Sequence, residues 1–364
     1  MHRAPFIAAL LAAASATAHA QTATVYGLLD SGIEHLDRVG ADGRSLTRVP
    51  GLSGSVPSRL GFRGSEDLGG GLKADFTLEM GIGVDTGTFN QGGRAFGRQA
   101  WVGLSGPWGA LTLGRQYTML FYGLLDADVT GPNTFGSGSL DNYLPNARTD
   151  NALGYRGSFG AFTLGATYSF GRDAVNAGPS PSGTNCAGES ATDPKACREW
   201  SVMLRYATPA WGAVLAVDEI RGGSGAFAGL TRSDLRDTRS ALNGWFKTGD
   251  IKWGAGVIER RNEASAATPK SRLWHIGAST PLAGLWTLDA TLMRLKFDHS
   301  ANAATLAALR LSYLLSRRTA LYATAGHIGN DGTLALSVSN GAAGAAPAAG
   351  TGQSGVMLGM RHAF

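Results

Sequence analysis

Apolar and polar residues alternate along most of this 364-residue chain, and this period of two restricts its fold more than any other feature. The clearest apolar positions are Val25, Leu29 and Ile33; Leu72, Ala74, Phe76, Leu78 and Met80; Phe162, Leu164, Ala166, Tyr168 and Phe170; and Trp200, Val202, Leu204 and Tyr206. Because successive side chains of a strand point to opposite faces, each segment predicts a strand with one apolar face. No run of 18 apolar residues follows residue 20, so the pattern excludes helical membrane spans and predicts an all-β fold.

The first twenty residues have the pattern of a cleaved secretory signal. Arg3 supplies a positive charge, residues 7–14 form a short apolar core, and Ala18-His19-Ala20 has the small-x-small cleavage pattern. The apolar core is much shorter than the roughly 20 residues that a transmembrane helix needs. We therefore expect a signal peptide over 1–20 and an exported mature chain over 21–364 that forms one domain.

The last nine residues alternate as well. Val356, Leu358, Met360 and Phe364 share one parity, which His362 interrupts near the end. The segment alone fits the edge strand of a soluble sheet. It also resembles the closing strand of Gram-negative outer-membrane β-barrels, and that resemblance implies that Phe364 serves as an assembly signal. The predicted export of the chain favours the barrel.

The whole mature chain divides into sixteen such segments, an even number as bacterial single-chain barrels require. They span 23–35, 57–66, 72–84, 95–106, 109–117, 150–158, 161–170, 199–207, 211–221, 238–249, 251–262, 271–281, 285–297, 303–316, 318–328 and 355–364. Glycine, with 53 residues, is about twice as frequent as usual, which suits strands and tight turns better than helices. We predict a 16-stranded antiparallel transmembrane β-barrel.

Connections and aromatic residues agree with this fold class. Short connections that contain Gly or Pro alternate with long ones at 36–56, 118–149, 171–198, 222–237 and 329–354. Six tryptophans are expected near strand ends, where membrane barrels carry aromatic girdles: Trp101, Trp200, Trp211, Trp253, Trp274 and Trp286.

Residues 58–74 closely resemble the second hairpin of general diffusion porins. Residues 24–27, 97–104 and 113–117 resemble the first, fourth and fifth strands of that family, and the ending 359–364 is similar to that of β-proteobacterial porins. The resemblance implies a homotrimer of barrels, each with a water-filled pore that a loop over about 118–149 narrows by folding inward. It also implies contacts with outer-membrane lipid and lipopolysaccharide, with the barrel-assembly machinery, and with small hydrophilic solutes that diffuse passively.

Fixed charges at the narrow point of such a pore decide which ions pass. Strand parity and the resemblance assign the basic wall to Arg59, Arg63, Arg98 and Arg148, and the candidate carboxylates are Glu79, Asp126, Asp128 and Asp141. Thr134 stands where related porins carry an acid in the loop. Excess arginine predicts a preference for anions. The alternative is that these arginines are ordinary solvated residues on a polar face.

Other functions find little support in the sequence. Cys186 and Cys197, the only cysteines, are expected to form a disulfide in an exported chain. No histidine lies near them, so no metal site is predicted, and no cofactor or catalytic motif is recognised. The basic excess is too mild and dispersed to predict nucleic-acid binding. A barrel that acts as an adhesin or structural protein remains the alternative, and it would carry the 118–149 loop on the outside.

Overall fold

A computed structural model describes residues 22–52, 54–173, 186–226, 229–339 and 344–364. The predicted signal peptide, 1–20, lies outside the described residues and stays a prediction. No helix in the part of the chain that the structure describes is long and apolar enough to cross a membrane.

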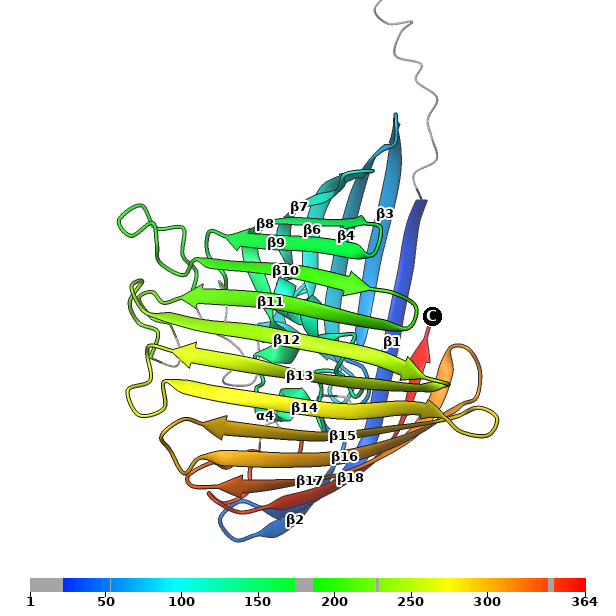
Figure 1. Cartoon of the computed structure of the whole chain (residues 1–364), viewed down its shortest axis with the longest axis vertical. Coiled ribbons are helices and arrows are strands. Elements are labelled where there is room, and N and C mark those ends of the chain that lie inside the picture. Colours follow the sequence, from blue (N-terminus) through cyan, green and yellow to red (C-terminus); the bar gives the residue numbers. More distant parts are fainter. Residues whose placement is uncertain (1–21, 53, 174–185, 227–228, 340–343) are drawn as a thin grey trace, which may run out of the picture.

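Sixteen strands of the described chain form a closed antiparallel barrel, as predicted (Figure 1). They are β1 (Thr22–Val39), β3 (Arg59–Gly69), β4 (Leu72–Gly83), β6 (Gln99–Gly106), β7 (Gly109–Tyr117), β8 (Arg148–Phe159), β9 (Phe162–Ser169), β10 (Glu199–Ala207), β11 (Trp211–Arg221), β12 (Arg236–Thr248), β13 (Ile251–Asn262), β14 (Lys270–Pro281), β15 (Trp286–Phe297), β16 (Ala303–Leu314), β17 (Thr319–Asp331) and β18 (Gln353–Ala363). Neighbours in sequence pair with each other, and β18 pairs with β1 to close the ring.

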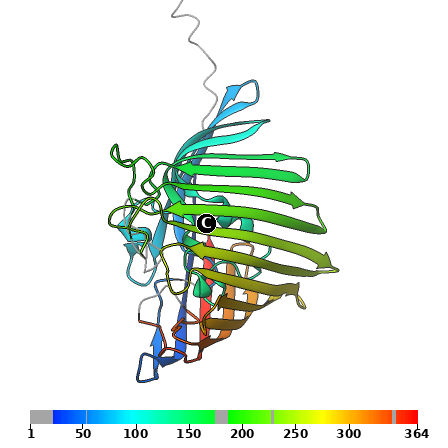
Figure 2. The same cartoon turned by 60° about the vertical axis from the view of Figure 1, so that its left-hand side comes forward.

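Turns at one end of the barrel are short, and the connections at the other end are long. The long connections hold the remaining short elements: β2 (Arg44–Arg48), β5 (Thr88–Phe89), α2 (Asn90–Gly93), α3 (Met119–Leu124), α4 (Ser137–Leu140) and η1 (Leu144–Asn146). Both views show the long connections gathered at one rim (Figures 1 and 2). We call the two rims the short-turn end and the long-loop end.

The outer face of the barrel is apolar, as the alternation predicts. Val25, Leu113 and Leu358 are more than half exposed because they point away from the lumen. Aromatic side chains cluster outward at the short-turn end, where Tyr206 lies 5.0 Å from Trp211 and Trp286 lies 4.7 Å from Tyr313 between ring centroids. Such a surface suits a hydrocarbon band bordered by an aromatic girdle.

Trp101 is an exception to the predicted girdle. It shares its parity with Gly103, whereas Val102 and Leu104 are exposed on the outer face. Its side chain lines a cavity inside the barrel. The girdle assignment of Trp101 is therefore wrong, because nearness to a strand end does not decide which face a side chain occupies.

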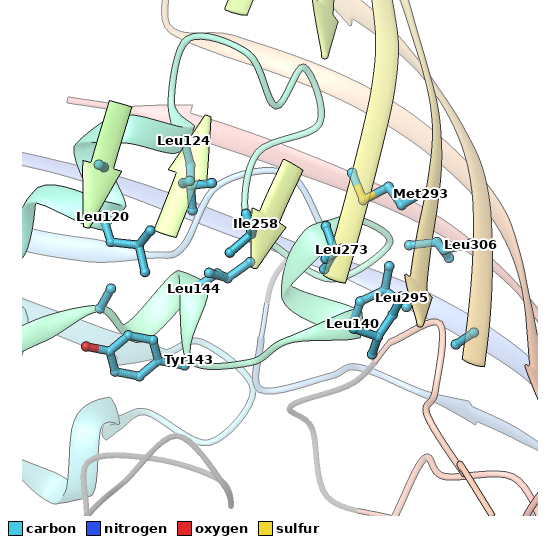
Figure 3. Close-up of a cluster of buried hydrophobic side chains, with 14 of the residues drawn as sticks. Leu120, Leu124, Leu140, Tyr143, Leu144, Ile258, Leu273, Met293, Leu295 and Leu306 are labelled. Carbon is cyan, nitrogen blue, oxygen red and sulfur yellow. The ribbon is translucent and has the colours of Figure 1, made fainter. Parts of the chain in front are cut away.

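The connection between β7 and β8 folds into the barrel, as expected for the 118–149 loop. Leu120 and Leu124 on α3 and Leu140 and Leu144 further along are fully or almost fully buried. Figure 3 shows them packed on side chains that point inward from the wall: Ile258 on β13, Leu273 on β14, Met293 and Leu295 on β15, and Leu306 on β16. The loop thus covers one half of the inner wall with an apolar core.

The resemblance implies a water-filled pore, but the inner wall is apolar where this core covers it. Ile258, Leu273 and Met293 are inward-facing but apolar, because the loop and not water covers them. Their presence explains why β13, β14 and β15 alternate less cleanly than β4 or β9. Both faces of these strands are apolar along part of their length.

Candidate functional site

A cavity of about 740 Å³ lies between the inward loop and the opposite half of the wall. Strands β1, β3, β4, β6, β7, β8, β16 and β18 of the barrel contribute to its lining, and residues 121–133 of the loop line the other side. Seven arginines contact it: Arg59, Arg63, Arg98, Arg148, Arg156, Arg310 and Arg361. Only two carboxylates of the described chain do so, Glu79 and Asp128, which leaves a formal excess of five positive charges. We call this space the basic cavity.

Glu79 is held between two of the predicted arginines. Arg98 Nε lies 2.7 Å from one of its oxygens, and Arg59 Nε lies 3.7 Å from the other. The Tyr26 hydroxyl donates to the same carboxylate over 2.9 Å. Antiparallel pairing explains the arrangement, because β1, β3, β4 and β6 are successive neighbours whose inward side chains meet across the sheet. The Glu79 charge is therefore matched on its own wall.

Arg98 and Arg148 converge on one phenol. Each donates from Nη2 to the Tyr117 hydroxyl, over 2.6 Å and 2.8 Å. The ring of Tyr117 stacks on Phe121 of α3 with centroids 3.9 Å apart, and the Arg148 guanidinium lies 4.3 Å from the Tyr117 ring centroid. Tyr117 ends β7 where the loop begins. The network joins two arginines to the base of the loop and keeps their charge beside the lumen.

Four arginines of the basic cavity have no carboxylate within 4.0 Å among the described residues: Arg63, Arg148, Arg156 and Arg361. Arg63 and Arg156 are exposed to the lumen and lie beside Tyr26 and Tyr122, at 5.1 Å and 4.4 Å from the ring centroids. Guanidinium groups stay charged at any relevant pH. These side chains therefore present permanent, uncompensated positive charge.

The predicted carboxylates are dispersed. Glu79 and Asp128 line the basic cavity, and Asp128 is buried in the loop, where it accepts hydrogen bonds from Thr130 and Ser137. Two others pair with arginines of the wall: Asp126 with Arg205 at 2.6 Å and Asp141 with Arg239 at 2.8 Å.

Thr134, which stands where related porins carry an acid, is also buried in the loop. The nearby loop residues that line the cavity are Gly131, Pro132 and Asn133.

Three cavity arginines were absent from the predicted constriction set. Arg310 lies at an inward-facing position of β16. It pairs with Asp289 at 2.9 Å and donates to the backbone carbonyl of Thr130 in the loop over 3.3 Å. Arg156 shares its parity with Gly154, opposite to the exposed Leu153, and Arg361 lies opposite to the exposed Met360. Strand parity could have placed both side chains inside, but the resemblance assigns neither of them to the constriction.

Cys186 and Cys197 are joined in a disulfide, as predicted. The bond closes a short loop at the long-loop end between β9 and β10. Both sulfur-bearing side chains are buried, beside Gly223 of the next long connection. The disulfide therefore constrains one long connection, which packs against the next, and neither cysteine lines the basic cavity.

The family of the chain follows from comparison with known proteins. A family model described as Gram-negative porin matches residues 8–333. This chain belongs to the Gram-negative porin family. Outer membrane porin protein 32 of Delftia acidovorans is 31% identical over 98% of each chain. An outer membrane porin of Bordetella pertussis is 29% identical over 87% of this chain and 91% of the relative.

Solved structures agree with the assignment. An anion-selective porin from Comamonas acidovorans is 26% identical, with a TM-score of 0.75 over 95% of this porin and 100% of that chain. The porin described here is therefore a bacterial outer-membrane channel for the passive diffusion of small hydrophilic solutes. Its inward loop is the feature that separates a channel from the alternative of an adhesin barrel. Members of the family are channels rather than enzymes.

Proposed function

We propose that this porin prefers anions and that Arg59, Arg63, Arg98 and Arg148 form the basic side of its constriction. The observation that carries the proposal is the charge of the basic cavity, with seven arginines against two carboxylates. Walls of low dielectric constant focus that field on the solute path and raise the local concentration of anions. The similar porin from Comamonas acidovorans, described as anion-selective, supports the same sign.

Reversal potentials in planar bilayers test the proposal. Purified barrels separating two KCl concentrations should give a potential that shows higher permeability for chloride than for potassium. The preference should be stronger near 0.1 M salt than near 1 M, because the Debye length falls from about 10 Å to about 3 Å. A preference for potassium would contradict the proposal, and the absence of discrete conductance steps would contradict a channel.

The acidic side of the constriction is proposed to consist mainly of Glu79 and Asp128, which contact the same cavity. Asp126 and Asp141 add less, because they pair with Arg205 and Arg239 and do not line the basic cavity. Replacing Asp126 with Asn should therefore change the reversal potential less than replacing Asp128 with Asn.

We further propose that lipopolysaccharide contacts the outer face of β13, β14 and β15 near the long-loop end. Five cations have outward parity there: Arg261, Lys270, Arg272, Arg294 and Lys296. Two carboxylates, Glu259 and Asp298, pair with Arg261 and Arg272 and leave an excess of three positive charges. The exposed Trp274 and Leu292 lie next to these cations on the side of the short-turn end. The surface therefore combines positive charge with apolar area, which suits an amphiphile with phosphate groups. Native mass spectrometry should find less bound lipid A in a double variant, Arg272→Gln with Arg294→Gln.

Assembly is proposed to depend on Phe364 and to yield a homotrimer. Phe364 and Gly27 exchange two backbone hydrogen bonds of 3.0 Å each, so the last residue helps to close the barrel. A Cβ atom at Gly27 would lie 2.3 Å from the Phe364 ring, which means that glycine makes room for it. Deleting Phe364 should reduce the yield of folded barrels in the outer membrane. Light scattering of the wild-type protein should give three times the protomer mass.

A further inference from the structure

Among the aromatic side chains inside the lumen, Trp101 on β6 differs from Tyr117 and Tyr122 in its surroundings. Trp101 points inward and is half-buried, and its indole nitrogen donates to the Gln99 side chain over 3.1 Å. Among the described residues no ring or guanidinium lies against its indole, whereas Tyr117 is covered by Phe121 and Tyr122 lies beneath Arg156. An uncovered aromatic face in a water-filled channel is available to a solute.

The strand register places this indole and an arginine in one row of the same wall. Arg63 pairs with Thr77, and Thr77 pairs with Trp101, so the three residues form one inward row across β3, β4 and β6. Neighbouring strands are about 4.8 Å apart, which separates the backbones of Arg63 and Trp101 by about 10 Å. Only the small side chain of Thr77 stands between them. We call this row the aromatic slot.

The slot opens on free space on both sides. All three residues line the basic cavity and also a second cavity of about 300 Å³ nearer the short-turn end. Arg63 is exposed and has no carboxylate within 4.0 Å among the described residues. A solute that passes from one cavity to the other therefore meets a flat apolar face and an uncompensated guanidinium at once.

We propose that the aromatic slot binds aromatic monocarboxylates as they cross the channel. The ring lies over Thr77 against the Trp101 indole, and the carboxylate accepts hydrogen bonds from the Arg63 guanidinium. A carboxylate that carries no flat ring can make only the contact with the Arg63 guanidinium. The inference rests on the proposed anion preference and adds the class of solute that the channel retains.

Benzoate and cyclohexanecarboxylate provide the test, because they share charge and approximate size but only benzoate has a flat aromatic ring. Each acid is added as its potassium salt to bilayers that contain the wild-type porin, and the reduction of chloride conductance is measured. Benzoate should reach half-inhibition at a concentration about two- to tenfold lower, the range that one aromatic contact supplies. Trp101→Leu should abolish the difference between the two acids, whereas Trp101→Phe should retain part of it.

Trp286→Leu is the matched control, because Trp286 is exposed on the outer face. It should behave like the wild type with both acids. Equal half-inhibition by the two acids in a wild-type channel that prefers chloride would overturn the slot alone. A benzoate advantage that survives in Trp101→Leu would also overturn it. A preference for potassium in KCl would instead overturn the proposed function.

Discussion

The two halves of the inner wall differ although both belong to the same closed sheet. Inward positions of β13–β16 carry Ile258, Leu273, Met293 and Leu306, and the inward loop covers them. Five of the seven arginines of the basic cavity come from the segment between β3 and β8, and the cavity remains open beside them. The comparison shows how the loop sets the path of the solute. It occupies the space beside the apolar half of the wall, and the space beside the charged half stays open.

The difference has a simple energetic origin. Burying a leucine side chain contributes about 1.5–3 kcal/mol, so a loop with several leucines is most stable against the apolar half. Moving the same leucines against the arginines would remove water from guanidinium groups, which costs several kcal/mol per unpaired ion. The loop therefore has one preferred side.

Removing uncompensated charge from the open half should have the largest effect. The triple variant Arg63→Gln, Arg156→Gln and Arg361→Gln removes three of the five excess charges. The ratio of chloride to potassium permeability, measured from reversal potentials, should fall severalfold toward one. Arg272→Gln, on the outer face, is the control and should leave the ratio unchanged. An unaltered ratio in the triple variant would mean that the solute path lies elsewhere.

Loosening the filled half should have the next largest effect. Leu120→Ala removes a fully buried side chain and should weaken the packing of the loop by about 2–5 kcal/mol. Single-channel conductance should rise and become noisier, while the thermal unfolding of the barrel changes little because the strands remain paired. Leu292→Ala removes an exposed outer side chain and serves as the comparison. Identical conductance traces for the wild type and Leu120→Ala would show that this packing does not hold the loop.

The ion pair between Asp141 and Arg239 should matter less. Burial by itself would raise the pKa of Asp141. The positive charges of Arg239 and Arg260 outweigh this effect, so the pKa lies below its usual value. The contribution to stability is thus present at neutral pH and is lost only as the pH falls through that lowered pKa. Asp141→Asn should weaken the loop by about 1–3 kcal/mol, since Arg239 keeps Asp237 as a second partner. At pH 7, backbone amides of residues 118–147 should therefore exchange hydrogen faster in Asp141→Asn than in the wild type. In the wild type, exchange at pH 5 should match exchange at pH 7 once each rate is corrected for its intrinsic pH dependence.

The disulfide should have the smallest effect on transport. Replacing Cys186 and Cys197 with Ser removes about 3 kcal/mol of local constraint in the chain-entropy model. Proteases should then cleave the 171–198 loop faster, while conductance and selectivity stay the same because the bond is remote from the basic cavity. A changed permeability ratio would indicate that the outer loops reach the solute path. Mass spectrometry of unreduced peptides should recover the linked pair from the wild type.

Much of the fold could be predicted from the chain alone. Strict alternation in β4 and β9 marks both their length and their outer face, because lipid and water impose opposite demands on successive residues. The same logic places Arg59 and Arg63 inside, opposite to Leu60 and Phe62. Where the inside is covered by protein, as at Ile258 and Leu273, the contrast between faces disappears and the pattern weakens.

The candidate site could be predicted only in part. Motif and parity together identify Arg59, Arg98 and Arg148, all of which contact the basic cavity. Arg156 and Arg361 have the right parity, but the resemblance assigns neither of them to the constriction. The carboxylates were harder still, because a loop has no period from which the direction of Asp126 or Asp141 could be read.

Period, turn chemistry and the two ends of the chain thus determine the class of this protein by themselves: an exported antiparallel barrel that faces lipid with one parity. Tertiary structure alone decided which half of the lumen stays open. Strand parity states only whether a side chain points in or out. The height of each strand in the barrel and the side on which the loop packs depend on contacts between segments far apart in sequence, such as Leu120 with the inner wall and Arg63 in one row with Trp101.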